Sequence, residues 1–131
     1  MRVERQLSLI LENRPGVLAE VCADLARAKV NVEAVTVANL VDHSVVRLVV
    51  SDPGRAIHLL GAGGVLVFEN EVVAVTAENR PGALAEIARR LGKAKVNIDY
   101  MYASTPNRGT ATIYLRVSSI KKAKQALARF R

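Results

Sequence analysis

The chain contains one pentapeptide twice, and this repetition constrains its fold more than any other feature of the sequence. Glu-Asn-Arg-Pro-Gly occupies residues 12–16 and returns at residues 78–82, an offset of 66 residues. Two further identities keep this offset: Leu-Ala-Glu at 18–20 and 84–86, and Ala-Lys-Val-Asn at 28–31 and 94–97. Identity that extends this far at one fixed spacing indicates duplication of a complete structural unit.

Length and composition limit what each repeated unit can be. The chain has 131 residues, of which 50% are apolar, and the repeat predicts one domain at residues 1–69 and a second at residues 70–131. Domains of this size bury a modest fraction of their surface and are marginally stable alone. We therefore expect the two to share a core or a sheet.

The first unit is predicted to follow the order β-α-β-β-α-β, the split βαβ arrangement of a ferredoxin-like fold. Strands are expected at residues 6–11, 31–38, 45–50 and 65–68, with helices beginning at Pro15 and at Ser51-Asp52-Pro53. The first helix has an apolar face at i, i+3, i+4 and i+7, formed by Leu18, Val21, Cys22 and Leu25. We expect Cys22, the one cysteine of the chain, to be buried there as a small apolar side chain.

The second unit repeats this pattern but shows no clear last strand. Its expected elements are strands at residues 71–77, 97–103 and 110–117, a helix beginning at Pro81, and a final helix capped by Ser118 or Ser119. One edge of its sheet must therefore be covered or paired. The predicted fold class is α+β, with two tandem ferredoxin-like units whose antiparallel sheets carry helices on one face.

Each copy of the pentapeptide lies where a strand is expected to lead into a helix. A helix N-terminus presents unpaired N–H groups and a partial positive charge, which together attract a carboxylate. Gly16 and Gly82 allow a ligand to approach the backbone closely, because they have no side chain. Asn13 and Asn79 each bring an acceptor and two donors, which suits an ammonium and carboxylate pair.

The repeated Glu-Asn-Arg-Pro-Gly-x-Leu-Ala-Glu, followed by an amphipathic helix and Val-Asn-(Val/Ile)-(Glu/Asp), resembles the ACT domain. The resemblance covers essentially the whole chain as two tandem copies. It implies ferredoxin-like modules that bind an amino acid and regulate amino-acid metabolism. The loop residues that it implies as ligand-binding are Asn13, Arg14, Pro15, Gly16, Val17 and Leu18, together with Asn79, Arg80, Pro81, Gly82, Ala83 and Leu84.

The resemblance also implies a second half of each site. In amino-acid-binding ACT domains the loop asparagine works with a residue at the start of the second strand of a neighbouring domain. These positions pair Asn13 with Asn97, and Asn79 with Asn31, at an interface between ACT units. The alternative is structural, with the strand asparagines serving as turn residues and the loop asparagines as helix caps.

Two positions in each repeat depart from the ACT pattern. Some members carry His two residues before the loop asparagine, where this chain has Leu11 and Ala77, which leaves the side chain of the ligand open. Members also often end the first helix with Gly, where this chain has Lys29 and Lys95. A left-handed lysine costs roughly 1 kcal/mol, so we expect these helices to end in another way.

The formal net charge of +7 raises the question of an acidic partner. Much of it lies near the C-terminus, where no acidic residue follows Asp99: Arg116, Lys121, Lys122, Lys124, Arg129 and Arg131. We expect a solvated helix face rather than a nucleic-acid surface. No stretch approaches the roughly 18 apolar residues of a spanning helix, and no signal segment is evident, so we expect a cytoplasmic protein without a membrane partner.

The sequence favours a non-catalytic amino-acid-binding regulatory protein with no metal and no cofactor, because no cluster of ligating or nucleophilic residues is apparent. Val45 and Val49 lie on a sheet face that is normally polar, so we expect this face to pack against another sheet, from the other unit or from another chain. We also expect a homodimer formed through ACT sheets or helices. The alternative function is that of a regulatory subunit of a biosynthetic enzyme, because Glu-Asn-Arg-Pro-Gly-Val-Leu also resembles the start of the acetolactate synthase small subunit.

A nucleic-acid-binding sheet is least favoured, because such a sheet stacks bases on aromatic side chains and only Tyr100, Tyr102 and Tyr114 are available for this.

Overall fold

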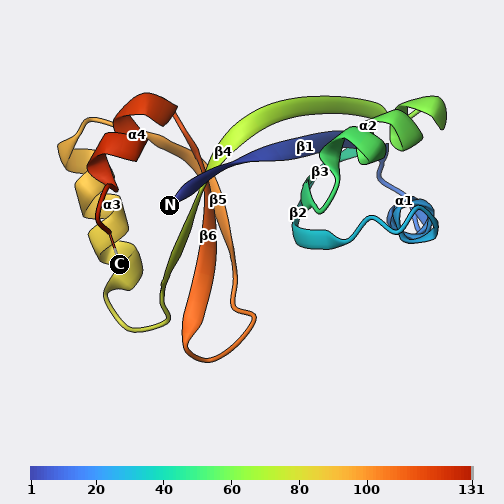
Figure 1. The fold of residues 1–131 in the computed structure, drawn as a ribbon. Coiled ribbons are helices and arrows are strands. Elements are labelled where there is room, and N and C mark those ends of the chain that lie inside the picture. Colours follow the sequence, from blue (N-terminus) through green and yellow to red (C-terminus); the bar gives the residue numbers. More distant parts are fainter. Residues whose placement is uncertain (131) are drawn as a thin grey trace. The chain divides into compact units, whose positions relative to one another are not determined.

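The computed structural model describes residues 1–130, which form two compact α+β units. The first unit comprises residues 5–70, and the second comprises Met1–Glu4 together with the described residues from Glu71 onward. In chain order the elements are β1 (Arg2–Glu12), α1 (Val17–Arg27), β2 (Val32–Leu40), β3 (His43–Val50), α2 (Pro53–Ala62), β4 (Leu66–Glu78), α3 (Ala83–Lys93), β5 (Ile98–Ser104), β6 (Thr110–Val117) and α4 (Ile120–Ala126) (Figure 1). No helix within residues 1–130 has the length and apolar character needed to cross a membrane.

The first unit has the strand order β2-β3-β1-β4, with two helices packed on one face of the sheet. The central strand β3 places Val46 opposite Leu9 of β1, and Leu48 opposite Val35 of β2. Alternate residues of β1 and β3 meet the apolar stripes of α1 and α2 in one core, formed chiefly by Leu7, Leu9, Leu11, Val46, Leu48, Val50, Val21, Leu25, Ala56 and Leu60. Burial of each large side chain in that core contributes about 1.5–3 kcal/mol.

β4 is one strand of 13 residues, where the sequence predicts separate strands at residues 65–68 and 71–77. The polar pair Glu69-Asn70 does not interrupt it, because both side chains bond to β1. Arg5 donates two hydrogen bonds to the Glu69 carboxylate, one of them from Nη2 over 3.0 Å, and Gln6 Nε2 donates to Asn70 Oδ1 over 3.0 Å. The hydrogen bond from Arg5 also lowers the pKa of Glu69. Polar side chains that are paired across two strands remain compatible with a regular sheet.

The second unit has the strand order β1-β4-β6-β5 and a core of its own beneath α3 and α4. β6 places Ile113 opposite Val75 of β4, and Leu115 opposite Met101 of β5. The core is a cluster separate from that of the first unit and includes Val73, Val75, Ala77, Ile87, Leu91, Val96, Ile113, Leu115, Val117, Ala123 and Leu127. The final helix is capped by the Ser119 side chain, which accepts a hydrogen bond from the Lys122 N–H over 3.2 Å.

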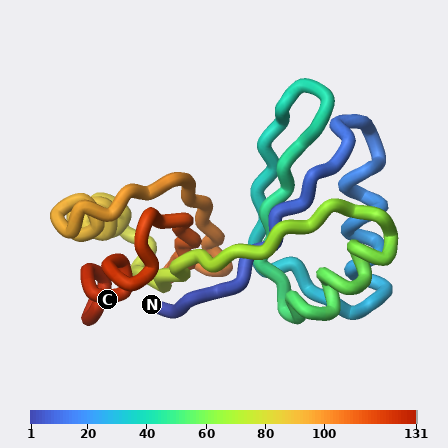
Figure 2. The backbone as a smooth tube through the Cα atoms, turned by 90° about the horizontal axis from the view of Figure 1, so that it is seen from above, coloured from blue at the N-terminus to red at the C-terminus, as the bar shows by residue number. Residues whose placement is uncertain are grey.

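The sheet edge that the sequence leaves open in the second unit is occupied by the first residues of the chain. β1 begins at Arg2, before the predicted start at residue 6, and Met1–Glu4 groups with the second unit. β1 and β4 are hydrogen-bonded neighbours, and in Figure 2 the blue N-terminal end lies with the orange and red second unit. The sequence gives little sign of this segment as a strand, because Arg2, Glu4 and Arg5 are charged. Each ferredoxin-like unit therefore has four strands, and the predicted α+β fold class is confirmed.

The expectation that Cys22 is buried is wrong, because its side chain is exposed. The residues of α1 that face the core are Val21 and Leu25, with Val17 packed partly against them. This stripe follows the i, i+4 and i+8 positions, and Cys22 lies one residue further round the helix, at about 100° from Val21. The apolar face that contacts the sheet is therefore narrower than the sequence pattern predicts.

The expectation that the first helix of each unit avoids a left-handed lysine is also wrong. Lys29 has φ of 60° and Lys95 has φ of 59°. In the second unit the Lys95 N–H donates to the Gly92 carbonyl over 3.0 Å, and the Val96 N–H donates to the Leu91 carbonyl over 2.9 Å. The latter bond is the long bond of a Schellman motif, and it places buried Val96 against buried Leu91. This apolar contact and the bonds to the last carbonyls offset the cost of the left-handed lysine.

The left-handed lysines yield a stability prediction. Lys95→Gly is expected to raise the free energy of unfolding by about 0.5–1 kcal/mol, because glycine adopts this conformation without a Cβ penalty. The control Arg89→Gly, at an exposed position within α3, is expected to lower it by about 1 kcal/mol. Urea unfolding measures both, as shifts of the midpoint at constant slope. Equal destabilisation by the two substitutions would contradict the left-handed conformation of Lys95.

Candidate functional site

The two strand-to-helix corners have the same backbone. Gly16 and Gly82 are the N-cap residues of α1 and α3, with φ of 92° and 90°, and neither helix has a side-chain cap hydrogen bond. The glycine carbonyl of each corner accepts the first helical hydrogen bond, over 3.0 Å from Glu20 N and 3.0 Å from Glu86 N. The interpretation of Asn13 and Asn79 as helix caps therefore does not hold. The first N–H of each helix donates to a loop carbonyl, from Val17 to Arg14 over 3.5 Å and from Ala83 to Arg80 over 3.3 Å. No side chain of the corner occupies the N–H groups that follow, and such groups suit an anion.

The asparagine side chains differ between the corners. The backbone N–H groups are used alike: Asn13 donates to the Asp42 carbonyl over 2.9 Å, and Asn79 donates to the Gly109 carbonyl over 3.1 Å. The Asn13 side-chain Nδ2 also donates to the Val41 carbonyl over 3.0 Å, and thereby supports the β2–β3 turn. Within residues 1–130 the exposed Asn79 amide has no hydrogen-bond partner. Its oxygen and both N–H donors remain available to a ligand.

The arginine of each corner is held by neighbouring carboxylates. Arg14 Nε donates to Glu12 over 2.8 Å, and this hydrogen bond raises the pKa of the Arg14 guanidinium. Arg80 lies 3.3 Å from Glu78 and 3.7 Å from Glu86, and its Nη1 lies 3.4 Å from the Pro81 carbonyl. Such exposed ion pairs contribute little stability, so each arginine can exchange its partner for the carboxylate of a ligand.

A hollow of about 180 Å³ lies beside the second corner, between the start of α3 and the ends of β4, β5 and β6. Its apolar wall is formed chiefly by Ala77, Ala83, Leu84, Met101, Ala111 and Ile113. Its polar edge includes Glu78, Asn79, Arg80 and Thr105. The hollow therefore combines an apolar cleft with the loop that carries the available asparagine.

The first corner borders a different hollow, of about 450 Å³. Leu11, Arg14 and Val17 line it together with His43 and the Gly63-Gly64 turn that connects α2 to β4. Although the two corners share a backbone, the spaces beside them therefore have different walls.

The predicted strand-start asparagines lie far from the loop asparagine of their own unit. Glu12, next to Asn13, is opposite His43, whereas Val32, next to Asn31, is opposite Val50 at the other end of β3. Seven residues of strand separate these ends, which corresponds to roughly 24 Å. No single unit can therefore bring both of its asparagines to one ligand.

The strand-start asparagines also take part in hydrogen bonds within their own units. The Asn31 N–H donates to Ser51 Oγ over 2.9 Å, and the Asn97 N–H donates to Ser118 Oγ over 2.9 Å. The Asn97 side chain additionally donates to Asp99 over 2.8 Å.

The other predicted site residues divide between the hollows and the exposed loop surface. Leu18 is 38% and Leu84 is 46% exposed, although both belong to the apolar repeat pattern. Pro15 and Pro81 are exposed and precede the glycines. Met101 of β5 and Ala111 of β6 also line the second hollow, and the loop motif in the sequence does not point to either of them.

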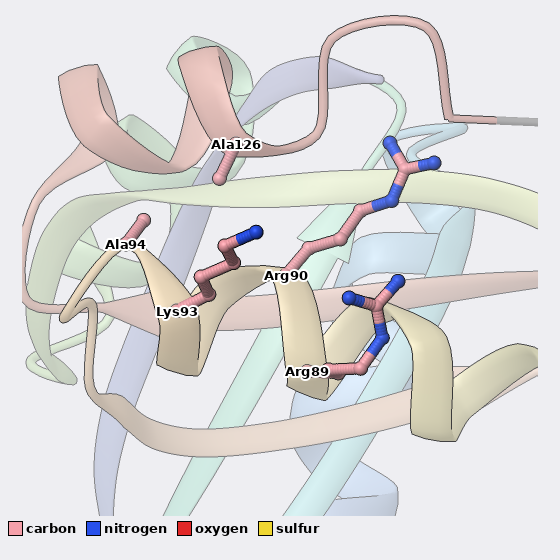
Figure 3. A pocket seen from close by; sticks show the side chains of 5 residues that line it. All are labelled: Arg89, Arg90, Lys93, Ala94 and Ala126. Carbon is pink, nitrogen blue, oxygen red and sulfur yellow. The ribbon is translucent and has the colours of Figure 1, made fainter.

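A third hollow, of about 420 Å³, is a basic groove between α3 and the C-terminal end of α4, lined by Arg89, Arg90, Lys93, Ala94 and Ala126 (Figure 3). Arg90 contacts Glu86 over 3.1 Å and the Ala128 carbonyl over 3.5 Å, and it lies 5.3 Å from the centre of the Phe130 ring. Arg90 therefore ties the C-terminal segment to α3. Arg131 lies outside the described residues.

The described residues also bear on metal binding and on nucleic-acid binding. Within residues 1–130, no group of three or more His, Cys, Asp or Glu side chains is placed to hold a metal ion. Tyr102 and Tyr114 stack on each other with ring centres 5.4 Å apart, and Tyr114 is 3% exposed. A buried ring engaged with a neighbour is poorly placed to stack on a nucleic-acid base.

Comparison with known proteins gives the family. A search of curated protein sequences found no significant match. A crystal structure of a protein from Bacteroides thetaiotaomicron is similar over 95% of this chain and 86% of that chain, with 36% identity and a TM-score of 0.91. The fold is also that of the regulatory subunit of aspartate kinase from Thermus thermophilus (16% identity, TM-score 0.73, 100% of this chain and 99% of that chain) and from Thermus flavus (16% identity, TM-score 0.65, 96% and 93%). The sequence matches the family described as the ACT domain pair over residues 1–129, and the chain belongs to that family.

Proposed function

We propose that this protein is a non-catalytic regulatory protein whose ACT units bind a free amino acid at a strand-to-helix corner. The observation that carries the proposal is the second corner, where the Asn79 amide has no partner among residues 1–130 and lies beside a helix start without a side-chain cap. An α-carboxylate suits the N–H groups of the helix start, and an α-ammonium suits the Asn79 oxygen or the Glu78 carboxylate. Arg80 offers a further positive charge to the carboxylate.

The proposed site is completed by a second ACT unit. Each loop asparagine is roughly 24 Å along the sheet from the strand-start asparagine of its own unit, so a partner asparagine has to come from elsewhere. A ligand that contacts two units favours the arrangement in which both contacts exist, by its difference in affinity between arrangements. This coupling is how binding would be converted into a regulatory signal, in a homodimer or in a complex with a metabolic enzyme.

The second candidate function is that of a regulatory subunit of an amino-acid biosynthetic enzyme. The regulatory subunits of aspartate kinase in the comparison share the fold over nearly their whole length, which supports this candidate through fold alone. The two candidates predict different behaviour, because a subunit of this kind changes the kinetics of a purified enzyme upon mixing. An amino-acid sensor that acts alone changes only its own assembly.

Amino-acid binding is tested by thermal unfolding of the full chain in the presence of each of the twenty amino acids. A ligand at 100 times its Kd is expected to stabilise the folded state by about 2.7 kcal/mol, which raises Tm by several degrees. Asn79→Ala is expected to weaken affinity by about tenfold or more, because it removes hydrogen bonds to charged groups. The matched control Asn39→Ala, at an exposed position of β2, is expected to leave affinity unchanged. No stabilisation by any of the twenty would refute the proposal.

The glycine of the second corner gives a second test. Gly82→Ala is expected to lower the free energy of unfolding by about 1–2 kcal/mol and to weaken amino-acid binding, because φ of 90° is strained for a residue with a side chain. Gly92→Ala lies within α3 and has open space around its new methyl group. It is expected to raise stability by about 0.5–1 kcal/mol and to leave binding unchanged. Retention of full stability and affinity by Gly82→Ala would show that the left-handed corner is dispensable.

A further inference from the structure

The two repeats differ in the size of the residues beside their corners. Ala77 and Ala83 form part of the apolar wall of the second hollow, and at the offset of 66 residues the first unit has Leu11 and Val17. Leu11 is 5% exposed and belongs to the core of its unit. Replacement of leucine and valine by two alanines removes five carbon atoms from the space between the helix start and the strand ends.

The size and lining of the second hollow indicate what it can hold. Its volume is about 180 Å³, and its wall also includes Met101 and Ile113. An apolar cavity of about 150 Å³ is large enough to bind benzene, so this hollow accommodates a group of four to six carbon atoms. A charged group placed against such a wall would lose its hydration without a partner.

The polar groups are confined to the edge of the same hollow. Asn79 and Arg80 lie at the start of the loop, and the Asn79 amide has no partner within residues 1–130. In the first unit the equivalent Asn13 amide is bonded to the Val41 carbonyl over 3.0 Å. The second corner thus joins a polar anchor to an apolar cleft. In the first corner, leucine and valine stand where the second has alanines, and the asparagine amide is already hydrogen-bonded.

From these differences we propose that the second corner is the amino-acid site of this chain and that it selects a ligand with an apolar side chain of leucine, isoleucine or methionine size. The side chain enters the hollow between Ala77, Ala83 and Ile113, while the ammonium and carboxylate remain at Asn79 and the start of α3. The first corner borders a larger hollow, of about 450 Å³, but Glu12, Arg14 and His43 line it, so it offers no comparable apolar cleft and takes no ligand of this class. This inference rests on the proposed function, to which it adds the ligand class and the corner that binds it.

The inference is tested by giving the second corner the larger side chains that the first corner has. The double variant Ala77→Leu/Ala83→Val fills the hollow and is expected to weaken binding of leucine, isoleucine and methionine at least tenfold, since the ligand side chain can no longer be buried. The control Ala85→Leu/Ala88→Val adds the same five carbon atoms at exposed positions of α3 and is expected to bind as the unaltered chain does. Thermal unfolding without ligand checks that both variants fold.

Isothermal titration with leucine, methionine, aspartate, lysine and glycine supplies the selectivity. Leucine and methionine are expected to bind at least tenfold more tightly than the other three, and Asn13→Ala is expected to leave their affinities unchanged. A preference for aspartate, lysine or glycine, or unaltered affinity in folded Ala77→Leu/Ala83→Val, would overturn the inference and leave amino-acid binding itself intact. Absence of binding by all twenty amino acids in the thermal screen would remove the proposed function, and this inference with it.

Discussion

The left-handed glycine between strand and helix is the constraint on which the corners of this protein depend. With φ of 92° at Gly16 and 90° at Gly82, the chain turns from the sheet into the helix without a capping side chain. A residue with a Cβ atom would be strained in this conformation, and a capping serine or aspartate would occupy the N–H groups of the first turn. The glycine therefore fixes the direction of the helix and also keeps its N-terminus available.

Duplication preserved this backbone while the surrounding side chains diverged. Both repeats keep the glycine N-cap, the left-handed lysine at the helix end, and the serine that bonds to the strand-start asparagine. Among the positions that differ are two beside the corners, where Leu11 corresponds to Ala77 and Val17 corresponds to Ala83. The corners therefore border hollows of different size and lining, about 450 Å³ at the first and about 180 Å³ at the second, on a framework that is otherwise repeated.

Much of the fold follows from local sequence signals. The repeat, the period-two pattern of β6 and the Asp52-Pro53 helix start predict elements that the structure contains, and Asp52 accepts the Arg55 N–H over 3.1 Å as a helix cap should. The errors arise where contacts distant in sequence decide the outcome. β4 continues through Glu69-Asn70 because Arg5 and Gln6 pair with those side chains, and the charged first residues form a strand because β4 offers an unpaired edge.

The candidate site was predictable to a smaller extent. The sequence identifies the loops, but it gives the two asparagines the same role, because hydrogen bonding of Asn13 to Val41 depends on the β2–β3 turn. The sequence also shows that Val17 corresponds to Ala83. The consequence of that difference depends on how closely α3 approaches the strand ends, which only packing determines.

The most direct test of unequal corners is a ¹H–¹⁵N NMR titration of the side-chain amides with the amino acid that stabilises the chain most. The spectra of Asn79→Ala and Asn13→Ala assign the two resonance pairs. The Asn79 amide resonances are expected to shift on binding, while those of Asn13 stay in place. Equal shifts at both asparagines, or a shift at Asn13 alone, would contradict the assignment of binding to the second corner.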